Sequence, residues 1–398
     1  MERVVGTVAR GIRTPIVHQG DHIEEIVVES ILKASANEGF SLRDRDVVGI
    51  TESVVARAQG NYASVDAIAA DLREKFLGDT MGVIFPILSR NRFAILLRAI
   101  ARSKRHIVLM LSYPSDEVGN HLVDLDQLDD NNICPWTDAL TEEAFREAFG
   151  ETVHPFTGID YIAYYRSIIE EEGALCTIIF SNQPKTILEH TPNVLACDIH
   201  TRFRTRRQLL AAGARTVHCL DEILNASVEG SGYNPQYGLL GSNKATEETV
   251  KLFPRDCQPV VDRIQAMLKE RTGKAVEVMI YGDGAFKDPV GKIWELADPV
   301  VSPAYTSGLE GTPNEIKIKY LADNQFAGLT GEALMEAISK HIEEKKTDLT
   351  GAMEAQGTTP RRLTDLIGSL CDLTSGSGDK GTPVVYIQGY FDHYANKD

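Results

Sequence analysis

The run Ile107-Val108-Leu109-Met110-Leu111 is an uninterrupted apolar stretch, which is typical of a buried β-strand. Apolar residues at helical spacing occur just before it, at 62–76 and 90–102, and predict two amphipathic helices. Around this centre the same order recurs: strand-like runs occur at 4–8, 47–50, 176–180 and 194–197, and helical patterns occur near 23–32 and from about 202 onward. The repeated order of strand and helix predicts a mixed α/β fold.

The last third of the chain continues this pattern. A helix is expected over 246–271, beginning at Thr246 and kinked at Pro254, followed by a strand at 276–281. Two further helices are expected near 330–344 and 359–372, and a closing strand at 384–388. The acidic segment 124–138 predicts a surface excursion, and the glycine-rich stretch 229–242 predicts a loop.

Length and composition bound the possible functions. A chain of 398 residues with 43% hydrophobic residues is expected to form two domains, which we place at 1–240 and 241–398. The net charge of -16 argues against nucleic acid as a partner. No apolar run approaches the ~20 residues that span a bilayer, so no membrane partner is expected. The six cysteines include no C-x-x-C pair, which favours a reducing cytoplasm.

The segment Tyr281-Gly282-Asp283-Gly284-Ala285-Phe286-Lys287-Asp288 lies where a buried strand is expected to end. Glycines on both sides of Asp283 allow close backbone approach, and a carboxylate there suits the oxygen shell of Mg²⁺ or Mn²⁺. A turn in which Asp283 accepts hydrogen bonds from neighbouring amides explains the same pattern equally well. The spacing therefore predicts either a metal ligand or a turn.

A second glycine-rich segment, 373–383, reads Leu-Thr-Ser-Gly-Ser-Gly-Asp-Lys-Gly-Thr-Pro. Its glycines spell G-x-G-x-x-G, but the expected helix precedes the loop and the expected strand follows it, which is the reverse of the dinucleotide-binding order. Lys380 is also misplaced for a P-loop. We therefore expect neither a Rossmann nor a P-loop site. Backbone amides of this loop can hold phosphate oxygens, and a surface loop without a ligand is the equal alternative.

The N-terminal region supplies two more candidate segments, Thr14–Asp21 before a helix and Thr51–Gly60 after a strand. Arg57 is a candidate phosphate contact, and Asp21 is expected to cap the helix that begins near Ile23. Isolated histidines such as His18, His154 and His200 lack metal-ligand spacing. Four arginines at 202, 204, 206 and 207 are either an anion contact or ordinary solvated side chains.

Taken in order, these segments resemble the coenzyme F-420 gamma-glutamyl ligase family. Pro15-Ile16-Val17-His18-Gln19-Gly20-Asp21 is similar to its opening motif, although His22 replaces a second acid. Val54–Gly60 resembles its second motif, with Arg57 in place of a lysine. Gly282–Phe286 resembles its metal motif, and Leu363–Tyr390 its closing helix, glycine loop and strand. Asp160 matches a further motif, but Ala163 replaces a nucleotide-contacting asparagine.

The resemblance implies a two-domain gamma-glutamyl-ligase-like fold of the mixed α+β type, with roles for individual residues. Asp283 and Arg57 are expected to be catalytic, and Asp160, Asp283 and Gly284 to bind metal. The arginines Arg202, Arg204, Arg206 and Arg207 are a hypothesis for the substrate's carboxylates. The expected nucleotide contacts are Pro15, Ile16, Val17, His18, Glu52, Ser53, Arg57, Ser375, Gly376, Ser377, Gly378, Asp379, Lys380 and Gly381.

The implied activity is a ligase that uses GTP or ATP with Mg²⁺ or Mn²⁺, and K⁺ as a further ion, to join an amino acid, L-glutamate, to a carboxylate through an acyl phosphate. The acceptor is F-420-0, a folate-like molecule or another small carboxylate, and a cytoplasmic homodimer is expected. Two alternatives stay open: a metal-dependent nucleotide phosphohydrolase, and a nucleotide-binding sensor without turnover.

Overall fold

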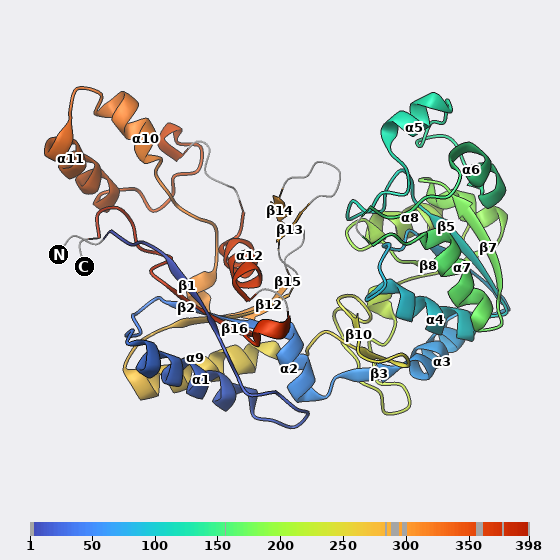
Figure 1. The fold of residues 1–398 in the computed structure, drawn as a ribbon, viewed down its shortest axis with the longest axis horizontal. Coiled ribbons are helices and arrows are strands. Elements are labelled where there is room, and N and C mark those ends of the chain that lie inside the picture. Colours follow the sequence, from blue (N-terminus) through green and yellow to red (C-terminus); the bar gives the residue numbers. More distant parts are fainter. Residues whose placement is uncertain are drawn as a thin grey trace. The chain divides into compact units, whose positions relative to one another are not determined.

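The structure is a computed structural model that describes residues 4–155, 157–282, 285–287, 294–296, 301–355, 361–375 and 378–396. It divides into two compact units. The first comprises residues 1–58, 256–286 and 295–398, and the second comprises residues 59–255 and 287–294. In Figure 1 the first unit carries the dark blue and the orange-to-red elements, and the second carries the green ones.

The division expected at residue 240 does not coincide with these units. The first 58 residues belong with the C-terminal part because their two strands enter a sheet with three later strands. The order in this sheet is β1, β16, β2, β12, β15, and only β2 and β12 pair in parallel. Their bounds are Val8–Ile12, Val384–Gln388, Val47–Thr51, Glu277–Gly282 and Val301–Tyr305.

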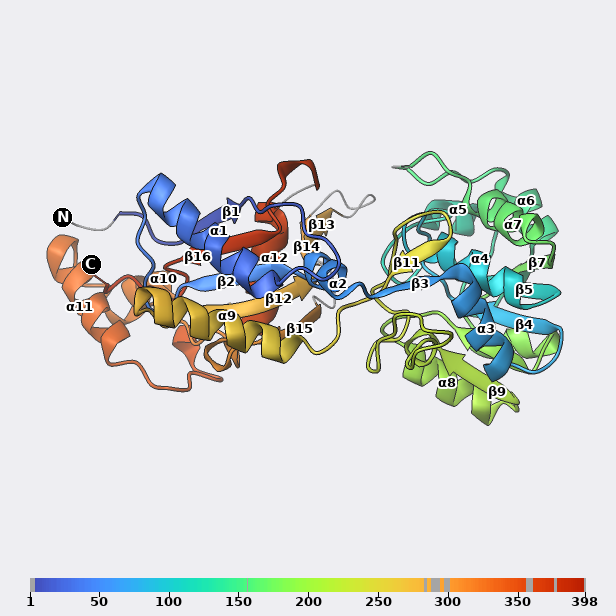
Figure 2. The same ribbon diagram turned by 90° about the horizontal axis from the view of Figure 1, so that it is seen from below.

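Side chains alternate between two apolar layers on this sheet, as the two-residue period of a strand requires. Val48 and Ile50 of β2 face a core shared with α1 (Ile23–Glu38) and α9 (Cys257–Thr272), which lie side by side. Val47 faces the opposite core, which includes residues of α12 (Leu363–Ser375). Figures 1 and 2 show α1 and α9 on one face of the sheet and α12 on the other. The sheet is therefore buried on both faces.

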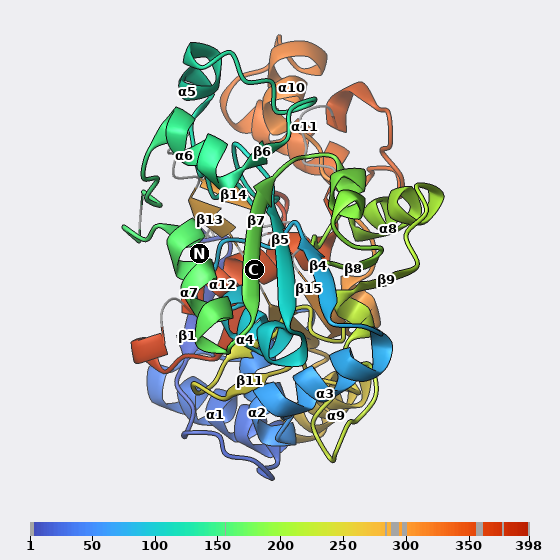
Figure 3. The ribbon, with the colours of Figure 1, turned by 90° about the vertical axis from the view of Figure 1, so that its right-hand side faces the viewer.

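The second unit contains a six-stranded sheet in the order β6, β7, β5, β4, β8, β9. The five strands from β7 to β9 are all parallel, and the short edge strand β6 is antiparallel to β7. Figure 3 shows these strands side by side. In sheet order their bounds are Leu140–Thr141, Leu175–Phe180, His106–Leu111, Thr80–Ile84, Asn193–Ala196 and Thr216–Cys219.

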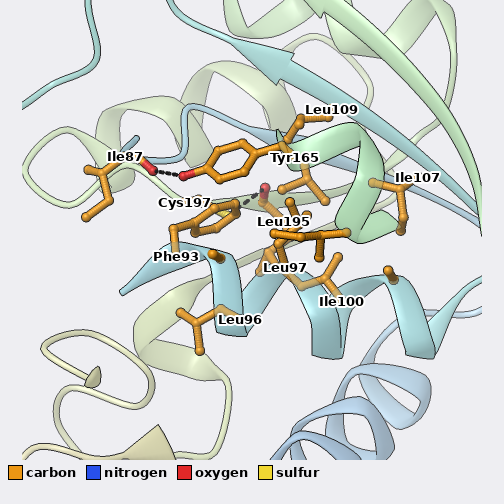
Figure 4. Close-up of a cluster of buried hydrophobic side chains, with 14 of the residues drawn as sticks. Ile87, Phe93, Leu96, Leu97, Ile100, Ile107, Leu109, Tyr165, Leu195 and Cys197 are labelled. Carbon is orange, nitrogen blue, oxygen red and sulfur yellow. Dashed lines mark hydrogen bonds between the residues drawn. The ribbon is translucent and has the colours of Figure 1, made fainter. Parts of the chain in front are cut away.

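Helices cover both faces of this parallel sheet. The larger core lies against α3 (Val65–Lys75), α4 (Phe93–Ser103) and α7 (Tyr161–Glu171), and the smaller one against α8 (Arg202–Ala211). In the larger core the Tyr165 hydroxyl donates to the Ile87 carbonyl over 2.7 Å, so this fully buried phenol is satisfied (Figure 4). Together the two units form a mixed α+β protein with mixed sheets, as expected from the sequence.

The chain enters and leaves the second unit at adjacent points. β3 (Tyr62–Ser64) pairs antiparallel with β11 (Thr249–Lys251), which also pairs with β10 (Asn243–Lys244). The helix expected over 246–271 is therefore wrong in its first half, and α9 begins only at Cys257. Val250 and Leu252 are buried against the larger core, and Pro254 cannot continue a helix from Thr246.

The remaining elements lie at the periphery. The acidic segment forms the short helix α5 (Leu125–Asp130) and is largely exposed, as expected, and α6 (Glu142–Phe149) follows it. In the first unit, α10 (Ile318–Tyr320) and α11 (Gly331–Glu343) carry a small core of their own. Among the described residues, no helix combines the length and apolarity needed to cross a membrane.

Candidate functional site

Four candidate segments lie at one edge of the first unit's sheet, the edge formed by the carboxyl ends of β1, β2 and β12 and by the start of β16. Val384 pairs with Ile12 of β1 on one side and with Ile50 of β2 on the other, and Thr51 pairs with Tyr281 of β12. Since β16 is antiparallel to β1 and β2, its first residues lie at the edge where β1, β2 and β12 end. Strand pairing thus gathers segments that lie far apart in sequence.

Backbone hydrogen bonds connect the loops at this edge. The Thr14 amide donates to the Gly381 carbonyl over 3.3 Å, and the Thr51 amide donates to the Pro383 carbonyl over 3.0 Å. The Gly20 amide donates to the Ala58 carbonyl, at the end of α2 (Glu52–Gln59), over 2.8 Å. The opening motif therefore contacts both the α2 motif and the glycine-rich loop.

The glycine-rich loop is closed at its base by a threonine. α12 ends at Ser375, and the Thr382 hydroxyl donates to the Ser375 carbonyl over 2.9 Å. Gly378, Asp379 and Lys380 form an exposed single turn, and Gly381 follows with a φ of 65°. Gly376 and Ser377 lie outside the described residues. An exposed turn beside a lysine is suited to phosphate oxygens.

The two charged candidates of α2 differ in environment. Glu52 is 7% exposed. Its charge, together with the larger effect of the thiol's own burial, raises the pKa of the nearby Cys257 to about 12. Arg57 is exposed, and its side chain makes no hydrogen bond or ion pair with the described residues. Ser53 is half-buried between them. Arg57 is thus available to a soluble anion.

The opening motif differs from expectation at Asp21, which does not cap α1. The N-cap position is His22, and the Asp21 carboxylate instead accepts the His18 amide over 2.7 Å. This bond closes a tight turn, which is an alternative use of a short acidic side chain. In the same motif Val17 is buried, whereas the other three predicted contacts, Pro15, Ile16 and His18, are exposed.

Comparison with known families agrees with this arrangement. The family model described as F420-0:gamma-glutamyl ligase matches residues 11–389, which include the whole of the second compact unit and most of the first. The chain belongs to this family. No curated protein matches the chain. Membership identifies it as a ligase enzyme, with gamma-glutamyl ligation in F-420 biosynthesis as the family's activity.

The metal site that the family resemblance implies depends on Asp283 and Gly284, which lie outside the described residues. Tyr281 and Gly282, which precede them, are buried in β12. In the described part of the chain, no three metal-ligating side chains come together. The donors at this edge, the Glu52 carboxylate and the hydroxyls of Ser53 and Ser375, are oxygens of the kind that Mg²⁺ and Mn²⁺ prefer.

Asp160, the other expected metal ligand, lies in the second unit and has structural partners on both oxygens. One oxygen caps α7 by accepting the amides of Ile162 and Ala163 at 2.9 and 3.0 Å. The other pairs with Arg146 over 2.6 Å. Asp160 therefore does not belong to the compact unit that contains the opening motif, α2 and the glycine-rich loop.

The four candidate substrate arginines also lie in the second unit, on α8, and they fall into two groups. Arg202 pairs with Asp221 and Arg206 with Glu222, at 3.2 and 2.8 Å. Arg204 and Arg207 are exposed and make no ion pair with a described residue. Only this second pair is available to an anionic ligand without breaking an existing interaction.

Sequence reasoning assigned no structural role to three residues at this edge of the sheet: Gly11, Tyr281 and Thr382. A Cβ atom on Gly11 would lie 3.0 Å from the Thr382 side chain, so the absence of a side chain at Gly11 lets β1 approach the base of the loop. Burial raises the pKa of the Tyr281 hydroxyl, which lies close to Ser375 at the end of α12. The sequence signal for Thr382 was its place directly after the last loop glycine.

Proposed function

We propose that the protein is a nucleoside-triphosphate-dependent ligase that joins L-glutamate to a small carboxylate acceptor. The observation that carries the proposal is the convergence of the Thr14, Thr51 and Gly381 segments, tied by backbone hydrogen bonds, at the edge where β12 runs toward Asp283. Family membership supplies the reaction class, and F-420-0 is the first acceptor to test.

The proposed reaction has two steps. An oxygen of the acceptor carboxylate attacks the terminal phosphorus of GTP or ATP, which forms an acyl phosphate and releases the nucleoside diphosphate. The deprotonated amine of L-glutamate then attacks the acyl carbon, forms the amide bond and expels inorganic phosphate. Positioning and charge neutralisation account for most of the catalysis in phosphoryl transfer of this kind.

The chain's own groups have distinct tasks in this scheme. The exposed turn at Gly378–Lys380 would bind phosphate oxygens through amides and the Lys380 ammonium, and Arg57 would approach the same anion. Thr382 would keep the base of the loop closed during binding. When bound through Asp283, Mg²⁺ or Mn²⁺ would supply further positive charge at the phosphates.

Phosphate release tests the proposal directly. We would incubate the protein with GTP or ATP, Mg²⁺ or Mn²⁺, L-glutamate and F-420-0, and repeat the assay with each component omitted. Release that requires both acceptor and L-glutamate, with a product heavier by one glutamyl group, is expected. Asp283→Ala should abolish release, whereas Asp126→Ala, an exposed acid on α5, should leave it unchanged.

Two other outcomes favour the alternatives. Phosphate release without any acceptor would indicate a nucleotide phosphohydrolase. Nucleotide binding without release under every mixture would indicate a sensor, which is the function that Ala163 in place of an asparagine favours. In either case the ligase proposal is rejected for these substrates, and a panel of other small carboxylates, including folate-like acceptors, tests whether the acceptor alone was misassigned.

A further inference from the structure

The parallel sheet of the second unit has a topological switch point. In sheet order its parallel strands are β7, β5, β4, β8 and β9. The chain therefore adds β5 and β7 on one side of β4, and then adds β8 and β9 on the other side. Helices α4 and α7 cover one face and α8 covers the opposite face. In doubly wound sheets, ligands bind outside the carboxyl ends of the strands at such a point.

A carboxylate already occupies the start of α8 at this edge. The consecutive amides of Ile199, His200 and Thr201 donate to the Glu117 carboxylate at 2.5, 2.9 and 2.9 Å. The Thr201 hydroxyl adds a contact of 3.3 Å to the same carboxylate. Glu117 comes from the loop after β5, whereas the amides belong to the connection from β8 to α8. Consecutive amides at a helix start form an anion site.

A second carboxylate beside these amides has one oxygen without a hydrogen-bond partner among the described residues. Asp198 is 1% exposed, and one of its oxygens accepts from the hydroxyls of Thr201 and Thr205 at 2.6 and 2.7 Å. Its other oxygen, Oδ1, is buried and accepts no hydrogen bond from any other residue in the described part of the chain. Because the Thr201 hydroxyl contacts both carboxylates, Asp198 lies next to the amides that bind Glu117. Burial and the Glu117 charge raise the pKa of Asp198.

An unpartnered buried carboxylate oxygen costs free energy unless a donor or a cation reaches it. The edge therefore offers two adjacent and complementary features: amides that bind a carboxylate, and an acid whose Oδ1 lacks a donor among the described residues. A free α-amino acid carries the matching groups on one carbon atom, an anionic carboxylate and a cationic ammonium. A simple dicarboxylate would bring a second negative charge toward Asp198, and a simple amine would leave the amides unused.

We propose that this edge of the second unit binds a free α-amino acid, whose carboxylate replaces Glu117 at the amides of Ile199, His200 and Thr201 and whose ammonium pairs with Asp198 Oδ1. Glu117 then acts as an internal competitor that fills the anion site when no ligand is bound. The proposal concerns a binding site distinct from the candidate ligase site of the first unit, and it does not depend on the ligase activity.

Calorimetric titration of the intact protein with common L-amino acids, without nucleotide or metal, tests this site. Glu117→Gln should bind the preferred amino acid about tenfold more tightly, because a neutral amide competes less well than a carboxylate for the three N–H groups. Asp198→Asn should weaken binding at least about tenfold, since the ammonium loses its charged partner. Glu143→Gln, an exposed glutamate on α6, is the matched control and should bind like the wild type.

Hydrogen exchange locates the binding event. Exchange in the loop 115–120 should rise on binding, because Glu117 is released, while the amides at 199–201 stay protected by the new carboxylate. The proposal is overturned if no amino acid binds either the wild type or Glu117→Gln, or if the two substitutions change affinity in the same direction. Binding that leaves the 115–120 exchange unchanged would also overturn it. None of these three results depends on phosphate release, so a failure of this proposal can be told apart from a failure of the ligase proposal.

Discussion

His154 shows how a single buried side chain in this protein couples stability to pH. Its Nε2 donates to Asn120 Oδ1 over 3.1 Å, and its Nδ1 accepts the Thr157 amide over 3.3 Å, which requires the neutral ring. Asn120 in turn donates to the buried Asp116 carboxylate over 2.8 Å. Burial lowers the pKa of His154, against a smaller opposing effect of the Asp116 charge.

The lowered pKa of His154 predicts that stability falls in mild acid. Since the unfolded chain protonates this histidine first, near pH 6.5, it binds more protons than the folded protein, and unfolding becomes easier as the pH drops below about 6.5. The raised pKa of Asp116 acts in the opposite sense nearer about pH 4. We expect the midpoint of thermal unfolding to change less between about pH 7.5 and 5.5 in His154→Gln than in the wild type. Equal changes in both proteins would contradict this account.

At the level of elements, local periodicity located most helices and strands but not their pairing. The run 107–111 lies in β5, and the pattern at 330–344 corresponds to α11. The pattern at 246–271 failed because Val250 pairs with Ala63, a partner far away in sequence. The same limit applies to the sites. Glu117 and Asp198 each follow an apolar strand, but only the strand order places them together.

Helix α12 packs on β2 at a position that tolerates no side chain. A Cβ atom on Gly49 would lie 2.3 Å from the Cys371 sulfur, which is fully buried. Gly49→Ala should therefore lower the free energy of unfolding by roughly 1–3 kcal/mol, as overpacking does elsewhere. Urea unfolding measures the loss, and Gly39→Ala, where nothing lies within 4 Å but φ is 69°, separates this clash from backbone strain.

A second substitution tests the cause of the Gly49→Ala effect. Removing the sulfur with Cys371→Ala should cost stability alone, because it leaves a cavity, but should recover part of the loss when combined with Gly49→Ala. Strictly additive effects of the two changes would show that the destabilisation arises elsewhere in β2. Movement of α12 would also displace Ser375 at the base of the glycine-rich loop, so nucleotide binding should weaken in the single glycine variant.

For the whole molecule, the chain passes from the first unit to the second after residue 58 and returns to the first unit at residue 256. The sequence-based division at 240 assumed that neighbours in sequence share a domain. In the sequence, residues 59–255 are instead inserted between strands β1 and β2 and the later strands of the same sheet. The family match over 11–389 includes segments on both sides of this insertion. Long-range strand pairing decides this, and neither composition nor hydrophobic periodicity reports it.

This arrangement predicts that residues 59–255 fold when expressed alone. The fragment contains the complete six-stranded sheet and both of its cores, and its ends are joined by β3 with β11. The Gln59 side chain accepts a hydrogen bond from the Arg255 amide over 3.0 Å and donates one to the Arg255 carbonyl over 2.5 Å. These bonds hold the first and last residues of the fragment next to each other. We expect a cooperative thermal transition by circular dichroism and a dispersed amide spectrum.

The matched control is the fragment 1–240, which is longer but divides both units. It lacks β11, the partner of β3, and it leaves β1 and β2 without β12, β15 and β16. The part of unit 2 that this fragment contains does not protect β1 and β2, whose apolar faces would stay exposed and favour aggregation. If 1–240 unfolds cooperatively as one body while 59–255 remains unfolded, the second unit depends on the N-terminal strands, and its treatment as an independently folding insertion must be abandoned.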